Sequence, residues 1–298
     1  MARQLVSFDW AMKKILRQKA NFGILEGFLT ELLKFDVKIE EILDSEANQE
    51  TKDDKFNRVD LLAKNENGEL ILIEVQYNDE VDYFQRILYG TSKLITEYIS
   101  KGMGYTKVKK VYSVNIVYFE IGQGDDYIYH GKMEFKGLHK DDILTPSKLQ
   151  KEKFSIESIS NIYPQYYILR INRFDDVAKN SLDEWIYFLK NEKITDKFEA
   201  KGLNEAKEAL DVLKLDDEDR AIYNRREENK RYKESLIYTA EIKGEIKGKI
   251  EGKIEGIAEG KKKRNIEIVK KSLSQGLDIE TIKIITGLSV EEIKVIKN

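Results

Sequence analysis

Apolar residues change their spacing several times along the first 200 positions, and each spacing predicts a different element. Within residues 9–35 they recur at i, i+4 and i+8, as on a helix with one buried face. Short runs rich in β-branched and aromatic residues predict strands instead. The expected helices cover residues 9–35, 82–100 and 181–191, and the expected strands cover residues 37 onward, 58–63, 69–75, 111–119, 127–135 and 166–171. This order predicts a mixed α/β core, with helices flanking a sheet, over residues 1–200.

The segment KNENG separates two of these strands and is rich in residues that favour turns. We therefore expect residues 58–63 and 69–75 to form a β-hairpin. Pairing around this loop places Asp60 almost opposite Glu74. Gln76 follows Glu74 by two positions, so both side chains point from the same face of the strand.

The pairing of Asp60 with Glu74 is unfavourable unless something compensates it. Cross-strand neighbours lie about 4.5–5.5 Å apart, and two ionised carboxylates at that separation repel each other by about 3 kcal/mol at an effective dielectric constant of 20. A raised pKa or a divalent cation such as Mg²⁺ would relieve the repulsion. The purely structural alternative is an ion pair of Asp60 with Arg58 or with a lysine of another strand. A register slip by one residue would also move Asp60 to the other face.

Beyond residue 200 the chain is helical in pattern and strongly charged. Glycine recurs every fourth residue from Gly244 to Gly260, and isoleucine does so from Ile242 to Ile254. On a helix the two rows lie on nearly opposite faces. Five glycines destabilise such a helix by about 4–5 kcal/mol relative to alanine. Two interpretations remain: a self-associating helix that a close partner supports, and a flexible tether.

The last 34 residues predict a small helical unit. Ser289 and Glu292 form a capping box for its final helix. A DNA-reading helix–turn–helix is one interpretation, but Glu291 and Glu292 open the would-be recognition helix with the wrong charge for phosphates. Packing against protein is the favoured interpretation. The expected organisation is a core of residues 1–200, a charged helical segment of residues 201–240, the glycine repeat of residues 241–264 and the helical unit of residues 265–298.

Composition and charge narrow the class of protein. The chain has a net charge of −3 and no cysteine, which excludes disulfides, thiolate metal sites and cysteine nucleophiles. Contact with nucleic acid would need a local basic surface. The first residues lack the apolar segment of a signal peptide, and no run of about 18 apolar residues predicts a membrane span. We therefore expect a cytoplasmic protein that does not enter a membrane.

The hairpin that carries Asp60, Glu74 and Gln76, with a helix before it and a helix and a strand after it, resembles the PD-(D/E)XK nuclease core. A more specific resemblance, to the branch of recombination-promoting nucleases and transposases, rests on the segments FDWAMKKIL, ILEGFLTELL, NRVDLLAKNENGELILIEVQY, YFQRILYGTSKLITEYISKG and VKKVYSVNIVYF. It extends through DEWIYFLKN into the glycine repeat, so it covers most of the chain. The resemblance implies a restriction-endonuclease-like fold, Mg²⁺- or Mn²⁺-dependent cleavage of double-stranded DNA, and a role in recombination or transposition.

Within the motif of that family, Asp60 matches the aspartate, Glu74 the (D/E) position and Gln76 the lysine position. The resemblance thus implies that Asp60 and Glu74 bind the metal and that Gln76 orients water or phosphate. Glutamine is what this branch uses, but it departs from the superfamily pattern and removes a positive charge that would stabilise the attacking hydroxide. Val59 stands where the superfamily has proline.

Three further residues are weaker candidates. Glu26 lies on the helix before the hairpin, where the superfamily often has an extra metal-binding carboxylate; the alternative is a solvated helix position. Gln85 and Arg86 begin the helix after the motif strand. An arginine there would clamp a scissile phosphate, and the alternative is a surface ion pair.

These features together predict a metal-dependent DNA endonuclease. Self-association through the glycine repeat would give a homo-oligomer with two active sites on one duplex. The main alternative is a catalytically weak DNA-binding or assembly protein on a nuclease scaffold. A third interpretation is an RNA nuclease, although the sequence has no clear aromatic platform for single strands.

Overall fold

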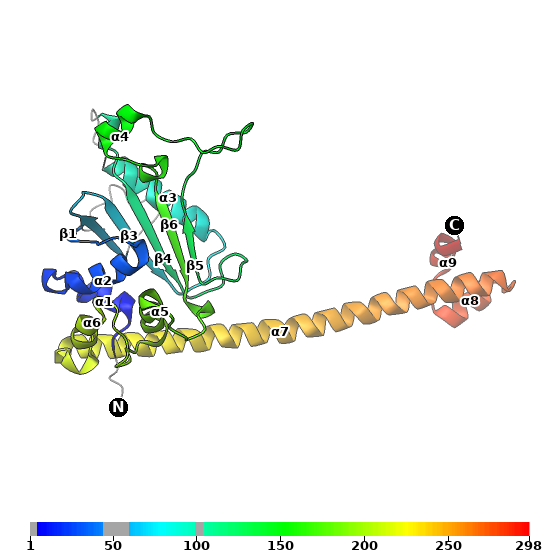
Figure 1. The fold of residues 1–298 in the computed structure, drawn as a ribbon. Coiled ribbons are helices and arrows are strands. Elements are labelled where there is room, and N and C mark those ends of the chain that lie inside the picture. The colour runs from blue at the N-terminus through cyan, green and yellow to red at the C-terminus, as the bar shows by residue number, and fades with distance from the viewer. Residues whose placement is uncertain (1–4, 44–59, 99–103, 298) are drawn as a thin grey trace. The chain divides into compact units, whose positions relative to one another are not determined.

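A computed structural model of the chain describes residues 5–43, 60–98 and 104–297 (Figure 1). The chain divides into two compact units, residues 1–223 and residues 224–298. The first unit contains a mixed sheet flanked by helices, and the second is helical. The fold class expected from the sequence, a mixed α/β core with a helical C-terminal extension, is therefore confirmed. The first compact unit runs beyond residue 200, where the composition changes.

The strands of the described residues form one six-stranded sheet in the order β1-β2-β3-β4-β6-β5. The pairs β3–β4 and β4–β6 are parallel, and the other neighbours are antiparallel. Every residue of β4 is buried, as expected for a parallel strand with helices on both sides. The strands are β1 (Ile39–Leu43), β2 (Leu61–Asn65), β3 (Leu70–Gln76), β4 (Val111–Val117), β5 (Ile128–Gly131) and β6 (Gln165–Arg170).

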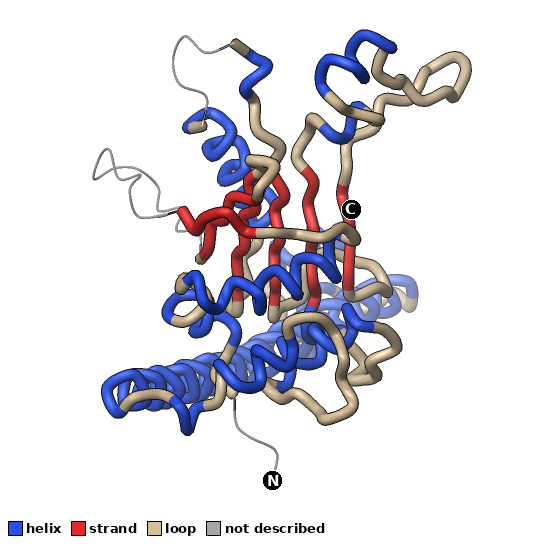
Figure 2. The backbone as a smooth tube through the Cα atoms, turned by 60° about the vertical axis from the view of Figure 1, so that its left-hand side comes forward, coloured by secondary structure: helices blue, strands red, loops and turns tan. Residues whose placement is uncertain are grey.

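Strand β3 presents apolar residues to both sides of the sheet, and the alternation of its side chains decides where the motif residues point. Leu70 and Leu72 pack in one cluster with Leu94 of helix α3 (Tyr83–Glu97). Ile71 and Ile73 belong to the main core on the other side. Because successive side chains alternate, Glu74 and Gln76 continue the side that α3 covers. The helices around the sheet are drawn in blue in Figure 2.

The main core joins the N-terminal helices to helices near the end of the first unit. Phe8 of helix α1 packs edge-on against Phe28 of α2 and Phe188 of α5, with ring centroids 5.4 Å and 6.3 Å away. Tyr223, near the start of α7, packs edge-on against Trp10 of α1 at 5.5 Å. The helices of this unit are α1 (Phe8–Lys14), α2 (Phe22–Leu33), α3, α4 (Lys148–Phe154), α5 (Ser181–Asn191) and α6 (Leu203–Ala209), with short 3₁₀ turns between them.

The second unit consists mainly of helix α7 (Asp217–Ser274), which begins in the first unit and runs without interruption through the glycine repeat. Helices α8 (Ile279–Thr286) and α9 (Val290–Lys297) follow. Val269, Ile282 and Ile293 are fully buried between these helices and form a small core. Among the described residues, none of the helices is both long and apolar enough to span a membrane.

The strand boundaries differ from the predicted ones at the motif hairpin. The first strand was expected at residues 58–63 but lies at Leu61–Asn65, while residues 58 and 59 lie outside the described part of the chain. The turn is shorter than the five residues of KNENG predict. The pairing continues into this segment, because the backbone amide of Asn65 donates to the carbonyl oxygen of Glu69 at 3.0 Å. Gly68 has a φ of +71°, which glycine adopts without strain. Strand β5 is also shorter than the predicted residues 127–135.

Candidate active site

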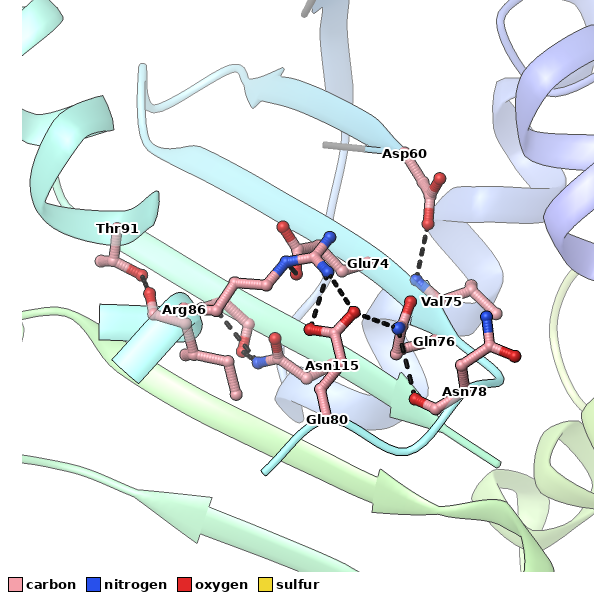
Figure 3. Close-up of polar contacts among 11 residues, drawn as sticks. Asp60, Glu74, Val75, Gln76, Asn78, Glu80, Arg86, Thr91 and Asn115 are labelled. Carbon is pink, nitrogen blue, oxygen red and sulfur yellow. Dashed lines mark hydrogen bonds and ion pairs between the residues drawn. The ribbon is translucent and has the colours of Figure 1, made fainter. Parts of the chain in front are cut away.

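Asp60 lies at the open end of the motif hairpin. In the antiparallel pairing of β2 with β3, Leu61 lies opposite Ile73. Asp60, one residue before Leu61, is therefore next to the end of β3 that carries Glu74. This is the position that the loop in the sequence predicts. The Asp60 Oδ2 atom accepts a hydrogen bond from the Val75 backbone amide at 2.7 Å (Figure 3). A bond between the carboxylate and the backbone of the neighbouring strand fixes the orientation of the Asp60 side chain.

Glu74 is buried, with 5% of its surface exposed. Its Oε2 atom lies 4.0 Å from Arg86 Nε, and neither atom makes a hydrogen bond within the described residues. Burial raises the pKa of Glu74 to about 7; attraction to Arg86 opposes this rise, and repulsion by Asp60 and Glu80 adds to it. The carboxylate is thus desolvated, with the long ion pair to Arg86 and the nearby Tyr83 hydroxyl as its partners, and such incomplete compensation is costly in a purely structural position.

Gln76, Glu80 and Arg86 form a connected polar network beside Glu74 (Figure 3). Gln76 Nε2 donates to Glu80 Oε1 at 2.5 Å and to the carbonyl oxygen of Asn78 at 3.2 Å. Arg86 Nη1 donates to both oxygens of Glu80, at 2.8 Å and 2.9 Å. Arg86 therefore lies between two carboxylates, and Gln76 is oriented by one of them.

Sequence reasoning missed Glu80, although this residue links Gln76 to Arg86. Glu80 lies in the loop between β3 and α3, next to other acidic and polar residues, and it shares no periodicity with the strand. Its role arises because the loop turns back over the end of β3. No spacing signal in the sequence would have distinguished Glu80 from Asp79, which is exposed.

Helix α1 contributes a second group that sequence reasoning did not assign. Lys13 Nζ lies 3.2 Å from Asp60 Oδ1 and 2.7 Å from Asp9 Oδ1. Arg17, just after the helix, donates to the Asp60 carbonyl oxygen at 3.1 Å. The Asp9–Lys13 spacing of four residues is a weak signal, because such pairs are common on ordinary helices.

A comparison with known families matches residues 6–240 to the PD-(D/E)XK nuclease family transposases. The chain belongs to this family. The matched segment includes the whole sheet, all the motif residues and the first part of α7. Comparisons with curated proteins and with solved structures give no match. The expected resemblance to nucleases of this superfamily is confirmed, and membership of a transposase family implies a nuclease that acts on DNA in transposition.

Glu26 and Gln85 lie apart from the polar network of this family member. Glu26 is buried, and its Oε1 atom accepts a hydrogen bond from the Ile39 backbone amide at 2.9 Å, while Oε2 accepts one from Lys38 Nζ at 3.1 Å. These contacts tie α2 to the start of β1, so they give Glu26 a structural task, and its metal-binding role stays a prediction. Gln85 is exposed on the first turn of α3, and its phosphate-binding role also stays a prediction.

The site of this PD-(D/E)XK nuclease family transposase fits a hard divalent cation, although the described residues hold no group of three or more His, Cys, Asp or Glu side chains placed for a metal. Mg²⁺ needs only one or two protein carboxylates when water and substrate phosphate complete its ligands. Asp60 and Glu74 supply two carboxylates of this kind. The buried Glu74 Oε2 atom, which has no hydrogen bond within the described residues, is the observation that fits a cation at this position.

Proposed function

We propose that the chain is a metal-dependent endonuclease that hydrolyses phosphodiester bonds of double-stranded DNA during recombination or transposition. The observation that carries this proposal is the desolvated Glu74 carboxylate, which lies beside Asp60 in the motif of a nuclease family. An ion held there would restore the charge that burial of Glu74 disfavours. Asp60 and Glu74 are the proposed ligands of Mg²⁺ or Mn²⁺, with Glu26 as a secondary candidate. We also expect the protein to act in the cytoplasm.

The residues around the proposed ligands have distinct tasks in hydrolysis. The bound ion would polarise the phosphodiester and lower the pKa of water. Asp60 is oriented by the Val75 amide, and Arg86 holds Glu74 and Glu80 together. Gln76 directs its Nε2 toward Glu80, which leaves its amide oxygen to accept a hydrogen bond from the attacking water and orient it, while the proton that the water loses passes to solvent. The water oxygen then bonds to phosphorus, the bond from phosphorus to the leaving sugar oxygen breaks, and that oxygen takes a proton from solvent.

Plasmid nicking tests this function. We expect the purified protein to nick supercoiled DNA with Mg²⁺ and to stop when EDTA is added. D60A and E74A should each lower the rate at least 100-fold, as expected when a group that stabilises transition-state charge is removed. The matched control is D79A, which removes an exposed carboxylate from the loop between β3 and α3. This variant should cut like wild type. Equal cleavage by D60A, E74A and wild type would contradict the assignment.

The alternative of a catalytically weak DNA-binding or assembly protein is favoured by one observation, the uncharged Gln76 at the lysine position of the motif. Its prediction is different: duplex DNA binds, Mg²⁺ produces no cleavage, and crystals soaked in Mn²⁺ show no ion between Asp60 and Glu74. The third interpretation, an RNA nuclease, is tested by replacing the duplex DNA with RNA in the same cleavage assay. Cleavage of RNA but not of DNA would favour it.

We further propose that the protein is a homo-oligomer through the glycine-repeat segment of α7, residues 241–264. Ile246, Ile250 and Ile254 are exposed along one row of this helix, and a β-carbon added at Gly248 or Gly252 would meet nothing within 4 Å. A second copy of the helix would approach the glycine row closely, and a further copy would cover the isoleucine row on the nearly opposite face. Such pairing would supply the two active sites that a double-strand cut requires.

A further inference from the structure

Helix α1 is buried over most of its length but ends in two lysines that face solvent. Phe8 to Met12 are all buried, whereas the side chains of Lys13 and Lys14 are 46% and 48% exposed. The two lysines are neighbours with nearly equal exposure, yet their surroundings differ. Lys13 Nζ lies 3.2 Å from Asp60 Oδ1, while Lys14 Nζ lies 3.8 Å from Asp219 Oδ1.

A buried carboxylate anchors Lys13. Asp9 is 3% exposed, and its Oδ1 atom lies 2.7 Å from Lys13 Nζ. Burying a carboxylate in the packed core is costly unless the charge is compensated, and a surface lysine needs no such anchor for stability. The ion pairs with Asp9 and Asp60 place the Lys13 ammonium group beside the motif aspartate.

The site lacks a cation where the superfamily motif has one, because Gln76 is uncharged. Arg86 faces the acidic residues of the network, since its Nη1 is bound by both oxygens of Glu80 and its buried Nε faces Glu74. Lys13 reaches Asp60 from the α1 side and keeps nearly half of its side chain in solvent. A phosphate bound at Asp60 would lie close to this ammonium group, which is 3.2 Å from Asp60 Oδ1.

We propose that Lys13 is the catalytic cation of this site: its ammonium group contacts the scissile phosphate beside Asp60 and replaces the charge that Gln76 lacks. Asp9 is then a positioning residue that holds Lys13. This inference rests on the proposed nuclease function, because a scissile phosphate exists only if the site cleaves DNA.

The cleavage experiment compares K13Q with the matched control K14Q at saturating Mg²⁺ on supercoiled plasmid. K13Q should lower the maximal rate about 100-fold, and K14Q should stay within twofold of wild type. Adding Q76K to K13Q should recover at least tenfold, because a lysine from the motif position restores the charge. D9N/K13Q removes both charges of the anchored pair and serves as the test variant where K13Q is too unstable to purify.

Duplex binding without metal gives a readout that is independent of cleavage. Each phosphate contact contributes about 0.9 to the slope of log binding constant against log salt. With a 20-base-pair duplex in EDTA, K13Q should reduce the slope by about one contact, and K14Q should leave it unchanged.

The outcomes separate the two proposals. Wild type that does not cleave with Mg²⁺ overturns the nuclease function and the Lys13 assignment with it. Wild type and K13Q that cleave at equal rates overturn the Lys13 assignment alone. A slow K13Q that Q76K does not rescue, or that keeps the wild-type salt slope, shows that Lys13 acts only on the structure and also overturns the assignment.

Discussion

At the scale of single residues, the buried surroundings of Glu74 disfavour its ionised form. The unfolded carboxyl has an ordinary pKa of 4.5, and burial raises the pKa in the folded protein to about 7. The folded state therefore binds this proton more tightly than the unfolded state. As the pH rises from about 4.5 to 7, the free energy of unfolding falls, and it stays lower above pH 7.

The substitution E74Q should relieve this penalty in metal-free protein. A difference of this size between the two pKa values corresponds to about 3 kcal/mol as an upper limit. We expect E74Q to unfold at higher urea than wild type at pH 8 in EDTA, and at nearly the same urea at pH 4.5. E157Q, which changes a carboxylate with 88% of its side chain exposed, is the control. A wild-type protein that loses no stability relative to E74Q between pH 4.5 and 8 would contradict the raised pKa.

At the scale of elements, helix α2 approaches the turn before α6 more closely than side chains allow. A β-carbon added at Gly27 would overlap the carbonyl group of Lys201 and lie 2.9 Å from Gly202 Cα. Trp185 of α5 fixes the same turn, because its Nε1 donates to the Lys201 carbonyl oxygen at 3.2 Å. Gly202 itself has a φ of +85°. The contact links three helices of the main core below the sheet.

G27A should therefore destabilise the first unit by about 1–3 kcal/mol, because neither backbone segment can move without repacking the core. G23A is the matched control on the same helix, since a β-carbon there meets nothing within 4 Å. Alanine at this exposed position should stabilise the helix by up to about 1 kcal/mol. Urea unfolding followed by circular dichroism measures both. Equal effects of the two substitutions would show that the close approach is absent in solution.

At the scale of the whole molecule, the glycine repeat decides whether the protein works alone or in an assembly. In the single chain, alanine at Gly248 and Gly252 would only strengthen the helix, because an added β-carbon meets nothing there. In an assembly where helices approach at the glycines, the same methyl groups would push the partners apart.

The double variant G248A/G252A is thus expected to raise the helical content of α7 while lowering the oligomer mass in sedimentation. The control is K249A, which removes an exposed side chain paired with Glu245 on the same helix and should leave the mass unchanged. A chain truncated near Glu241 should sediment as a monomer. A wild-type protein that sediments as a monomer at micromolar concentration would contradict self-association through this segment.

The sequence predicted the site only where the chain has regular periodicity. The turn residues of KNENG and the alternation of β3 were enough to place Asp60 opposite the Glu74 end of the strand, as the ladder confirms. Glu80 lies in an irregular loop, so its contact with Gln76 and Arg86 could not be predicted. The contacts of Glu26 with Ile39 and Lys38 depend on how α2 packs on β1, which local pattern does not specify.

The sequence by itself determined the class of fold, the order of its elements, the motif hairpin and the family, because periodicity and turn chemistry act over short stretches of chain. Only the tertiary structure decided how deeply Glu74 is buried and which cations stand near it. Lys13 and Asp60 meet because α1 and the hairpin pack against one core, and burial and charge proximity exist only after that packing.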